Sequence, residues 1–433
     1  MSLASLQSLP SFTEAWTADD DGQSNPLFFL SATGVVVDET GAYAVGLADG
    51  YDKLISVNPS TGAVSWAVTV PDAEYDSLST PTIDRNNGTV LVAAGNKLTA
   101  VRTNGTVAWQ RTLSQDVVNA SPTVTSDLGP RDRAFIVDFS AASLGVSNLY
   151  CINVDPYDAV NNPYQPGDIV WTRSLGARAA GSTPAYLDGV VYVGAIRTPS
   201  STAGQIMAFD ATSTAAGGPA PTWTFTNVIN AGFFGGLCVR DGTLYASSYA
   251  YSGNQLSANT VKLNTSTGAL IWSTPSNRTD AMPVVARGRV YVSGGLPQSV
   301  GAGYGTFPTV QAFDASTGTL VWDSALDSWN DTNHNSQVDM GEYLSIGGWS
   351  IQPFVITSAS AVQLVVGVMP EVPDDVFGPS VELVAIDLTA TPTATPPYYG
   401  IVVDEYAGAG SSPAYFDGMI YVVGPDGLTA LGP

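Results

Sequence analysis

The segment Asn264-Thr-Ser-Thr-Gly-Ala-Leu-Ile-Trp272 decides the fold, because versions of it recur along the chain. Its polar residues favour a tight turn, Gly268 supplies the positive φ that the turn needs, and the apolar residues that follow form a strand carrying Trp272. The same turn and Trp-bearing strand recur in residues 58–66, 102–109 and 314–322, and in weaker form before Trp171 and Trp223. The chain is therefore built from one repeated unit.

Three further strands are expected before each of these turns. The apolar segments directly before the turns are 53–58, 97–102, 148–153, 205–210, 309–314 and 382–387. The segments before those resemble Val190-Val-Tyr-Val and follow Gly turns such as 187–189. A first segment is marked by Pro81, Pro122, Pro184, Pro283, Pro353 and Pro413. Each unit is predicted to consist of four antiparallel strands.

The spacing of the Trp residues gives the number of units. They stand at positions 16, 66, 109, 171, 223, 272 and 322, between 43 and 62 residues apart, and units of this length made of four strands indicate propeller blades. One more fourth strand, without Trp, is expected through 399–403. The remaining C-terminal residues and the N-terminal strand 12–17 together make an eighth unit. We therefore predict an all-β, eight-bladed propeller, a single domain over 1–433, whose last blade is closed by 12–17 beside 427–431.

Composition and charge exclude several classes of protein. The chain has 433 residues with 44 Gly and 28 Pro, which suits short strands and turns and excludes an all-helical fold. The net charge of −23 reflects 38 acidic and only 15 basic residues, and no window clusters Lys and Arg as a nucleic-acid binder requires. No run of eighteen apolar residues suggests a membrane span. We expect a monomer that is secreted, periplasmic or at the cell surface.

The cysteine and histidine residues limit the possible chemistry. Cys151 and Cys238 are far apart and have no metal-ligand spacing, so we expect two buried free thiols. His334 is the single histidine, which excludes most catalytic arrangements that rely on imidazole.

The Thr-Gly-x-x-x-Trp segments ending at Trp66, Trp272 and Trp322 resemble the repeats of the quinoprotein dehydrogenases and of their non-catalytic relatives, the outer-membrane assembly lipoproteins. The resemblance covers nearly the whole chain and implies an eight-bladed propeller. It leaves two functions open: a binding or scaffold protein, or a dehydrogenase that uses pyrroloquinoline quinone (PQQ) to oxidise alcohols or sugars.

In the enzymes of this family, the resemblance implies PQQ and calcium in the central channel, a catalytic Asp, a stacking Trp and often a disulfide between adjacent cysteines. This chain has no Cys-Cys pair and no Cys-x-x-Cys-His haem motif. Its repeated Trp residues are expected on outer strands, as packing anchors. We therefore favour the non-catalytic function, expect no PQQ, and assign no catalytic or cofactor-binding residue.

Residues 331–342 match the spacing of an EF-hand calcium loop. The candidate ligands occupy positions one, three, five, seven, nine and twelve, and they are Asp331, Asn333, Asn335, Gln337, Asp339 and Glu342. Ser336 stands where glycine is usual, which departs from the pattern at the sharpest turn. We predict a structural Ca²⁺ site between blades six and seven. The alternative is a solvated loop rich in Asp and Asn.

Other acidic segments carry weaker signals. Residues 19–22, 155–168 and 371–375 are each rich in Asp, with Glu371 in the last of them, and fit either a cation site or a solvated loop.

The long connections point to a binding surface. In an antiparallel blade the short Asp-Gly and Thr-Gly turns share one face, and we expect all the long insertions on the opposite face. That face is the predicted surface for a protein or carbohydrate ligand, because binding residues concentrate in loops on a rigid scaffold. Its candidate residues are Tyr251, Tyr304, Phe307, Trp329, Trp349, Asp374, Asp375 and Phe377. The alternative is a set of solvent loops with incidental aromatic residues.

Overall fold

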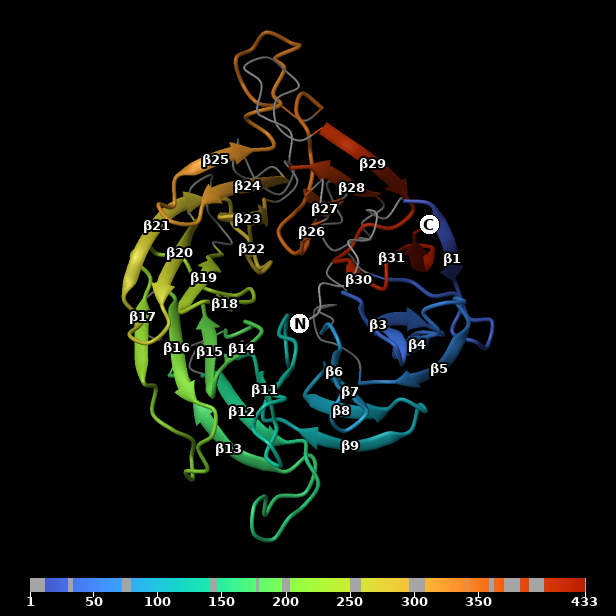
Figure 1. Cartoon of the computed structure of the whole chain (residues 1–433), viewed down its shortest axis with the longest axis vertical. Coiled ribbons are helices and arrows are strands. Elements are labelled where there is room, and N and C mark those ends of the chain that lie inside the picture. Colours follow the sequence, from blue (N-terminus) through green and yellow to red (C-terminus); the bar gives the residue numbers. More distant parts are fainter. Residues whose placement is uncertain are drawn as a thin grey trace.

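Eight four-stranded antiparallel sheets make up the described part of the chain and stand as blades around a central axis (Figure 1). The computed structural model describes residues 12–29, 34–71, 79–140, 146–176, 179–196, 203–249, 258–295, 308–339, 341–357, 362–369, 382–388 and 401–432. No helix in these ranges has the length and hydropathy to span a membrane.

The first four blades follow one another along the chain. Blade one comprises β2 (Val36–Asp38), β3 (Gly41–Ala48), β4 (Tyr51–Val57) and β5 (Val64–Thr69). Blade two comprises β6 (Thr82–Asp84), β7 (Thr89–Ala94), β8 (Lys97–Arg102) and β9 (Val107–Thr112). Blade three comprises β10 (Thr123–Val124), β11 (Arg133–Val137), β12 (Asn148–Asn153) and β13 (Ile169–Ser174). Blade four comprises β14 (Ala185–Leu187), β15 (Val190–Ala195), β16 (Gln205–Asp210) and β17 (Trp223–Thr226).

The second half repeats this order until the last blade. Blade five comprises β18 (Cys238–Arg240), β19 (Thr243–Ser247), β20 (Ala258–Asn264) and β21 (Leu270–Ser276). Blade six comprises β22 (Val284–Ala286), β23 (Arg289–Gly294), β24 (Thr309–Asp314) and β25 (Leu320–Asp323). Blade seven comprises β26 (Phe354–Thr357), β27 (Val362–Val368), β28 (Glu382–Asp387) and β29 (Ile401–Ala407). Blade eight comprises β30 (Ala414–Phe416), β31 (Met419–Gly424), β32 (Gly427–Leu431) and β1 (Glu14–Ala18).

The two ends of the described chain meet in blade eight, beside one another at the right of Figure 1. β1 pairs antiparallel with β32, from Glu14 opposite Leu431 to Ala18 opposite Leu428. The chain thus supplies the outer strand of its last blade from its N-terminal end. Both the number of blades and this closure are confirmed.

The core lies between neighbouring blades. All six positions of β7 are buried, whereas the outer strand β9 of the same blade is partly exposed throughout. An inner strand has a neighbouring blade on each face of its sheet, so both of its faces are apolar. This explains why the second and third strands of each unit read as continuous apolar runs.

The repeated Trp residues lie on the outer strands, as expected, and six of them reach across to the turn of the following blade. The Trp223 indole N–H donates to the Thr265 carbonyl oxygen at 2.7 Å, and its ring covers Gly268 of the same turn. The equivalent contacts are Trp16 on Gly62, Trp66 on Gly105, Trp109 on Gly167, Trp171 on Gly218 and Trp272 on Gly318. The glycine therefore serves twice, since it adopts a positive φ and also leaves room for the indole of the preceding blade.

Replacing Gly268 by Ala tests this contact between Trp223 and the turn of the next blade. A Cβ atom there would lie 2.5 Å from Trp223 Cε3, and Gly268 has a φ of +69°. Backbone strain and overpacking together should lower the free energy of unfolding by about 2–4 kcal/mol. Gly242→Ala is the matched control, because its φ is +72° and no atom lies within 4 Å of the added Cβ. If thermal unfolding shows equal losses for the two variants, the Trp contact contributes nothing.

Candidate functional sites: the central channel and the calcium loop

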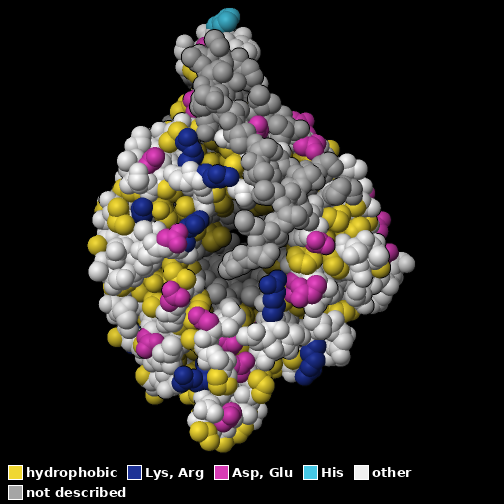
Figure 2. All heavy atoms as spheres, in the orientation of Figure 1, with side chains coloured by type: hydrophobic (Ala, Val, Ile, Leu, Met, Phe, Trp, Pro, Cys, Tyr) yellow, Lys and Arg dark blue, Asp and Glu magenta, His cyan; other side chains and the backbone are white. Residues whose placement is uncertain are grey.

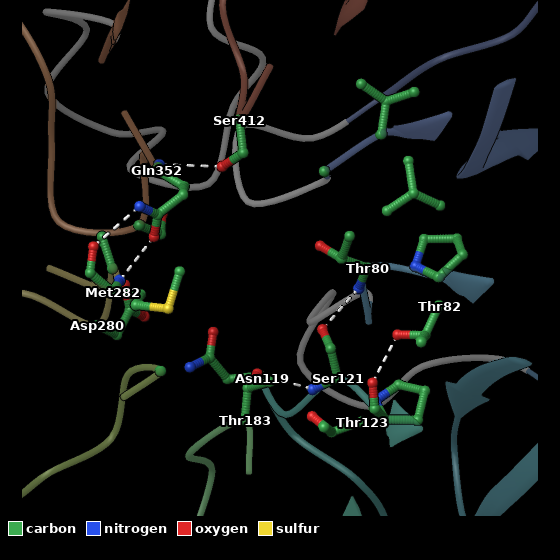
Figure 3. Close-up of a pocket in the computed structure, with 18 of the residues that line it drawn as sticks. Thr80, Thr82, Asn119, Ser121, Thr123, Thr183, Asp280, Met282, Gln352 and Ser412 are labelled. Carbon is green, nitrogen blue, oxygen red and sulfur yellow. Dashed lines mark hydrogen bonds between the residues drawn. The ribbon is translucent and has the colours of Figure 1, made fainter. Parts of the chain in front are cut away.

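A cavity of about 440 Å³ lies where the eight blades converge (Figure 3). Figure 2 shows one face of the molecule hollowed at this place. Each blade contributes wall residues at or just before its first strand, among them Gly34, Thr80, Ser121, Thr183, Gly236, Met282, Gln352 and Ser412. The channel is therefore lined by one short segment from every repeat.

Hydroxyl groups in this wall join one blade to the next. The N–H of Thr80 donates to Ser121 Oγ at 2.9 Å, and the N–H of Ser121 donates to Thr183 Oγ1 at 3.0 Å. On the opposite side, the N–H of Gln352 donates to Ser412 Oγ at 3.0 Å. All of these residues directly precede a proline, and their bonds join blade two to three, three to four and seven to eight. These hydroxyls have a structural role.

Asp280 is the sole ionisable residue among the described residues that line the channel. Its side chain is buried, and Oδ1 has no hydrogen-bond partner among the described residues. Burial raises the pKa of this carboxyl well above its usual range, which favours the neutral acid. Three residues before a proline, it occupies the same place in its repeat as Asn119 and Ser350, which also line the channel. The position three residues before the proline of each repeat was the signal by which the sequence could have revealed Asp280 as a channel residue.

The described lining of this wall offers PQQ no cationic partner. The quinone carries three carboxylates, which in a desolvated channel need cationic or strongly donating partners. The described lining offers hydroxyls, the amides of Asn119 and Gln352, and the carboxyl of Asp280, and it includes no Lys or Arg. An acid with a raised pKa would repel rather than neutralise the cofactor once ionised.

The predicted calcium ligands lie in the connection from β25 to β26, which extends outward from the rim at the top of Figure 1. The N–H of Asn335 donates to Asp331 Oδ1 at 3.1 Å, and the side-chain amides of Asn333 and Asn335 donate to Asp339 Oδ2 at 2.9 and 2.6 Å. Ser336, at the glycine position of the motif, has a φ of +60°, so the loop makes the sharp turn without glycine.

Glu342 faces the beginning of the same loop. Its Oε1 accepts hydrogen bonds from the Thr332 hydroxyl at 2.7 Å and from the Asn333 N–H at 3.1 Å, and Trp329 Nε1 donates to Oε2 at 3.3 Å. The Thr332 bond is the main cause that lowers the pKa of Glu342. In the described part of the chain, no group of three His, Cys, Asp or Glu side chains is arranged to hold a metal ion. Calcium binding would require the two side-chain amides to turn so that their oxygens face the ion, and it stays a prediction.

Two of the eight predicted binding-face residues fall within the described ranges. Trp329 is partly buried and contacts Glu342, so it belongs to the calcium loop. Trp349 is 7% exposed and packs in a core cluster with Tyr249, their ring centroids 5.8 Å apart. Its ring is therefore part of the interior. Outside the described residues lie Tyr251, Tyr304, Phe307, Asp374, Asp375 and Phe377.

The expectation that every long connection lies on one face is wrong for blade three. Residues 154–168 join β12 to β13, which are its third and fourth strands, so this long loop belongs with the short turns. Asp158 accepts hydrogen bonds from the N–H groups of Val160 and Asn161 at 2.8 and 3.0 Å, which fold the tip of the loop. The loop extends outward at the bottom of Figure 1.

In the acidic segment 19–22, Asp21 is already paired with a lysine of the same chain. Lys53 Nζ lies 2.5 Å from Asp21 Oδ2, and both residues are buried. Burial by itself would raise the pKa of Asp21, but hydrogen bonds from Lys53, Asn25 and Gln23 outweigh it and hold the pKa well below its usual range. The third acidic segment, 371–375, lies outside the described residues.

In the described part of the chain, six of the eight blades pack an outer-strand Trp on a glycine turn of the next blade, and this ring of blades defines a β-propeller of the quinoprotein-like repeat class. The sequence model of the family described as outer membrane protein assembly factor BamB matches residues 10–150 and 214–340, more than half of the chain. The chain belongs to this family. No curated protein sequence matches it.

Several solved structures share the fold. BamB from Moraxella catarrhalis is 15% identical, with a TM-score of 0.56 and 92% of each chain covered. A europium-containing methanol dehydrogenase is 12% identical, with a TM-score of 0.59, covering 94% of this chain and 84% of its own. A quinohemoprotein alcohol dehydrogenase from Comamonas testosteroni is 13% identical, with a TM-score of 0.52, covering 97% and 75%. At these identities the similarity establishes the fold alone.

Proposed function

We propose that this chain is a non-catalytic binding or scaffold propeller of the cell envelope, stabilised by a structural calcium ion. The observation that carries the proposal is the channel wall, where the hydroxyls bond one blade to the next and the described lining has no cationic group for an anionic cofactor. The description of the family as an outer membrane protein assembly factor supports a place in the envelope.

A partner would bind through the loops. The predicted binding surface consists of the long connections between strands, and loops held on a rigid scaffold commonly carry recognition. We propose a protein or carbohydrate ligand on the face of the long connections, and a secreted, periplasmic or cell-surface location. Fractionation of cells that express the full-length gene should recover the protein with the envelope or the medium, and recovery with the cytoplasm would contradict the location.

The second candidate is a PQQ-dependent dehydrogenase, favoured by the buried carboxyl of Asp280 in the channel. The two functions are separated by adding PQQ and calcium with a panel of alcohols and sugars, and measuring reduction of a redox dye. We expect no reduction above the protein-free background. Turnover that disappears in Asp280→Asn would establish the dehydrogenase and overturn the non-catalytic proposal.

Removing calcium should lower the melting temperature. An ion that binds the folded state alone stabilises it by about 2.7 kcal/mol when free calcium is a hundredfold above the dissociation constant. Differential scanning calorimetry with calcium and with chelator measures the difference. Bound calcium should have oxygen ligands at about 2.3–2.6 Å in a crystal structure. Equal melting temperatures in the two conditions would contradict the site.

Two substitutions assign that difference to the loop. Glu342→Gln removes the closing carboxylate and should abolish most of the calcium-dependent shift while the blades stay folded, because their cores lie elsewhere. Ser336 has a positive φ, which glycine adopts without strain, so Ser336→Gly should increase calcium affinity. Asp158→Asn, in the loop between β12 and β13, is the matched control and should leave the shift unchanged.

A further inference from the structure

We propose an anion-binding site between blades five and six, formed by Arg240, Lys262 and Arg287, which takes a small phosphate-type dianion. These three residues line one depression of about 310 Å³, together with Thr243 and Tyr245. The depression lies where the turn between β22 and β23 meets the strands β19 and β20 of the preceding blade.

Lys262 stands at a position that is small in the other blades. On the third strand, the residue opposite the outer-strand Trp is Ser56, Ala100, Cys151, Ala208 or Ala312 in blades one to four and six. In blade five it is Lys262, opposite Trp272. A charged side chain has replaced a small one at this single place among those six blades.

Arg287 is a second departure from the repeat. The turn between the first and second strands carries Asp188, Asp241 and Asp417 in blades four, five and eight, with φ values of 48°, 49° and 48°. Blade six keeps the conformation, with a φ of 51°, but has Arg287 in place of the acid. Both departures introduce a positive charge, and both charges line the same depression.

The geometry holds two of the cations in place and leaves the third available. Arg240 Nη1 donates to the Val285 carbonyl oxygen of blade six at 2.9 Å, which fixes the guanidinium across the blade boundary. Lys262 Nζ donates to the Ala315 carbonyl oxygen at 2.8 Å and lies 5.3 Å above the Tyr245 ring. Arg287 is exposed and makes no hydrogen bond or ion pair with the described residues.

The charge balance favours an anion here despite the acidity of the chain. Three cations line the depression against one carboxylate, Asp241, which is paired with Arg240 at 3.0 Å. Figure 2 shows the Lys and Arg spheres most numerous over β18–β25. At physiological salt, charges beyond about 8 Å are largely screened, so the local cations outweigh the distant acids.

The same charge balance selects the size of the ligand. Guanidinium forks and an ammonium group suit the several oxygens of a phosphate. A polyanion or an anionic membrane surface extends beyond the depression, so it would come close to the other acidic groups of a chain with a net charge of −23. The ligand is therefore a free small anion rather than a lipid headgroup.

The test is titration of the full chain with inorganic phosphate in low-salt chloride buffer, followed by isothermal titration calorimetry. We expect saturable binding of one phosphate per chain. Arg287→Asp and Lys262→Ala each restore the residue type of other blades, so both should fold. Each should weaken binding about tenfold or more, because each removes a charged partner of the anion. Wild-type protein without saturable binding, or variants that bind as tightly, would overturn the site.

Two comparisons complete the test. Arg102→Ala removes an exposed cation from the end of β8 and should leave phosphate affinity unchanged. An equal loss would show that net charge alone is responsible and overturn the proposal. Binding to phosphatidylglycerol vesicles without binding to free phosphate would overturn the assignment to a small anion.

Discussion

Deleting residues 1–18 should remove the cooperative unfolding of the native propeller and cause aggregation. The deletion takes away β1, and β32, which is buried at all five positions, then becomes an exposed strand edge. It also removes Trp16, whose indole N–H donates to the Pro59 carbonyl oxygen at 3.2 Å and thereby latches blade eight to blade one. Loss of a largely buried Trp side chain alone costs up to about 3–5 kcal/mol.

Thermal unfolding and light scattering measure this result. The matched control is deletion of residues 1–11, which retains Phe12 and its N–H bond to Asp404 Oδ2 at 2.7 Å. This shorter deletion should keep the strand pairing and the melting temperature. An unchanged melting temperature in the longer deletion would show that β1 does not stabilise the ring.

The second large effect is expected from Lys53→Met. This change leaves the carboxylate of Asp21 buried without its ammonium partner, and breaking a buried ion pair costs about 3–5 kcal/mol. Asp21 keeps its hydrogen bonds from Gln23 and Asn25 in this variant, so we expect the lower end, about 3 kcal/mol. Chemical denaturation of the variant and of wild type gives the difference. Asp241→Asn breaks the exposed pair with Arg240 and should cost less than about 1 kcal/mol.

A double variant isolates the uncompensated charge. In Lys53→Met with Asp21→Asn no charge remains buried, so much of the lost stability should return. If the double variant is as unstable as Lys53→Met, the loss comes from packing of the lysine stem.

The Lys53–Asp21 pair also predicts a pH dependence. The pKa of Asp21 is lower in the folded than in the unfolded state, so its stabilisation is complete above the ordinary carboxyl value of about 4. That stabilisation is lost as the pH falls through the lower folded-state value. Below pH about 4, the melting temperature of wild type should therefore fall more steeply than that of the double variant. Parallel curves would show that Asp21 does not titrate with unfolding.

Some features of the channel are visible in the repeated sequence, and others are not. The prolines mark the first strands correctly, and the residue before each proline is visible without a structure. That these residues bond to one another depends on how neighbouring blades pack, since Thr80 and Ser121 belong to different blades. That Asp280 has no other ionisable residue beside it in the described lining likewise depends on the residues that the other seven blades contribute to the cavity.

The sequence by itself determined the strands, the number of blades and their closure, because turn chemistry, apolar runs and repeat spacing are local properties. For example, 97–102 was predicted and is β8, and 12–17 was predicted and corresponds to β1 at 14–18. Only the tertiary structure decided which unit each side chain contacts. Trp223 packs on a glycine of the next blade, and Asp21 finds Lys53 on β4, because closing the ring brings together surfaces that no repeat contains alone.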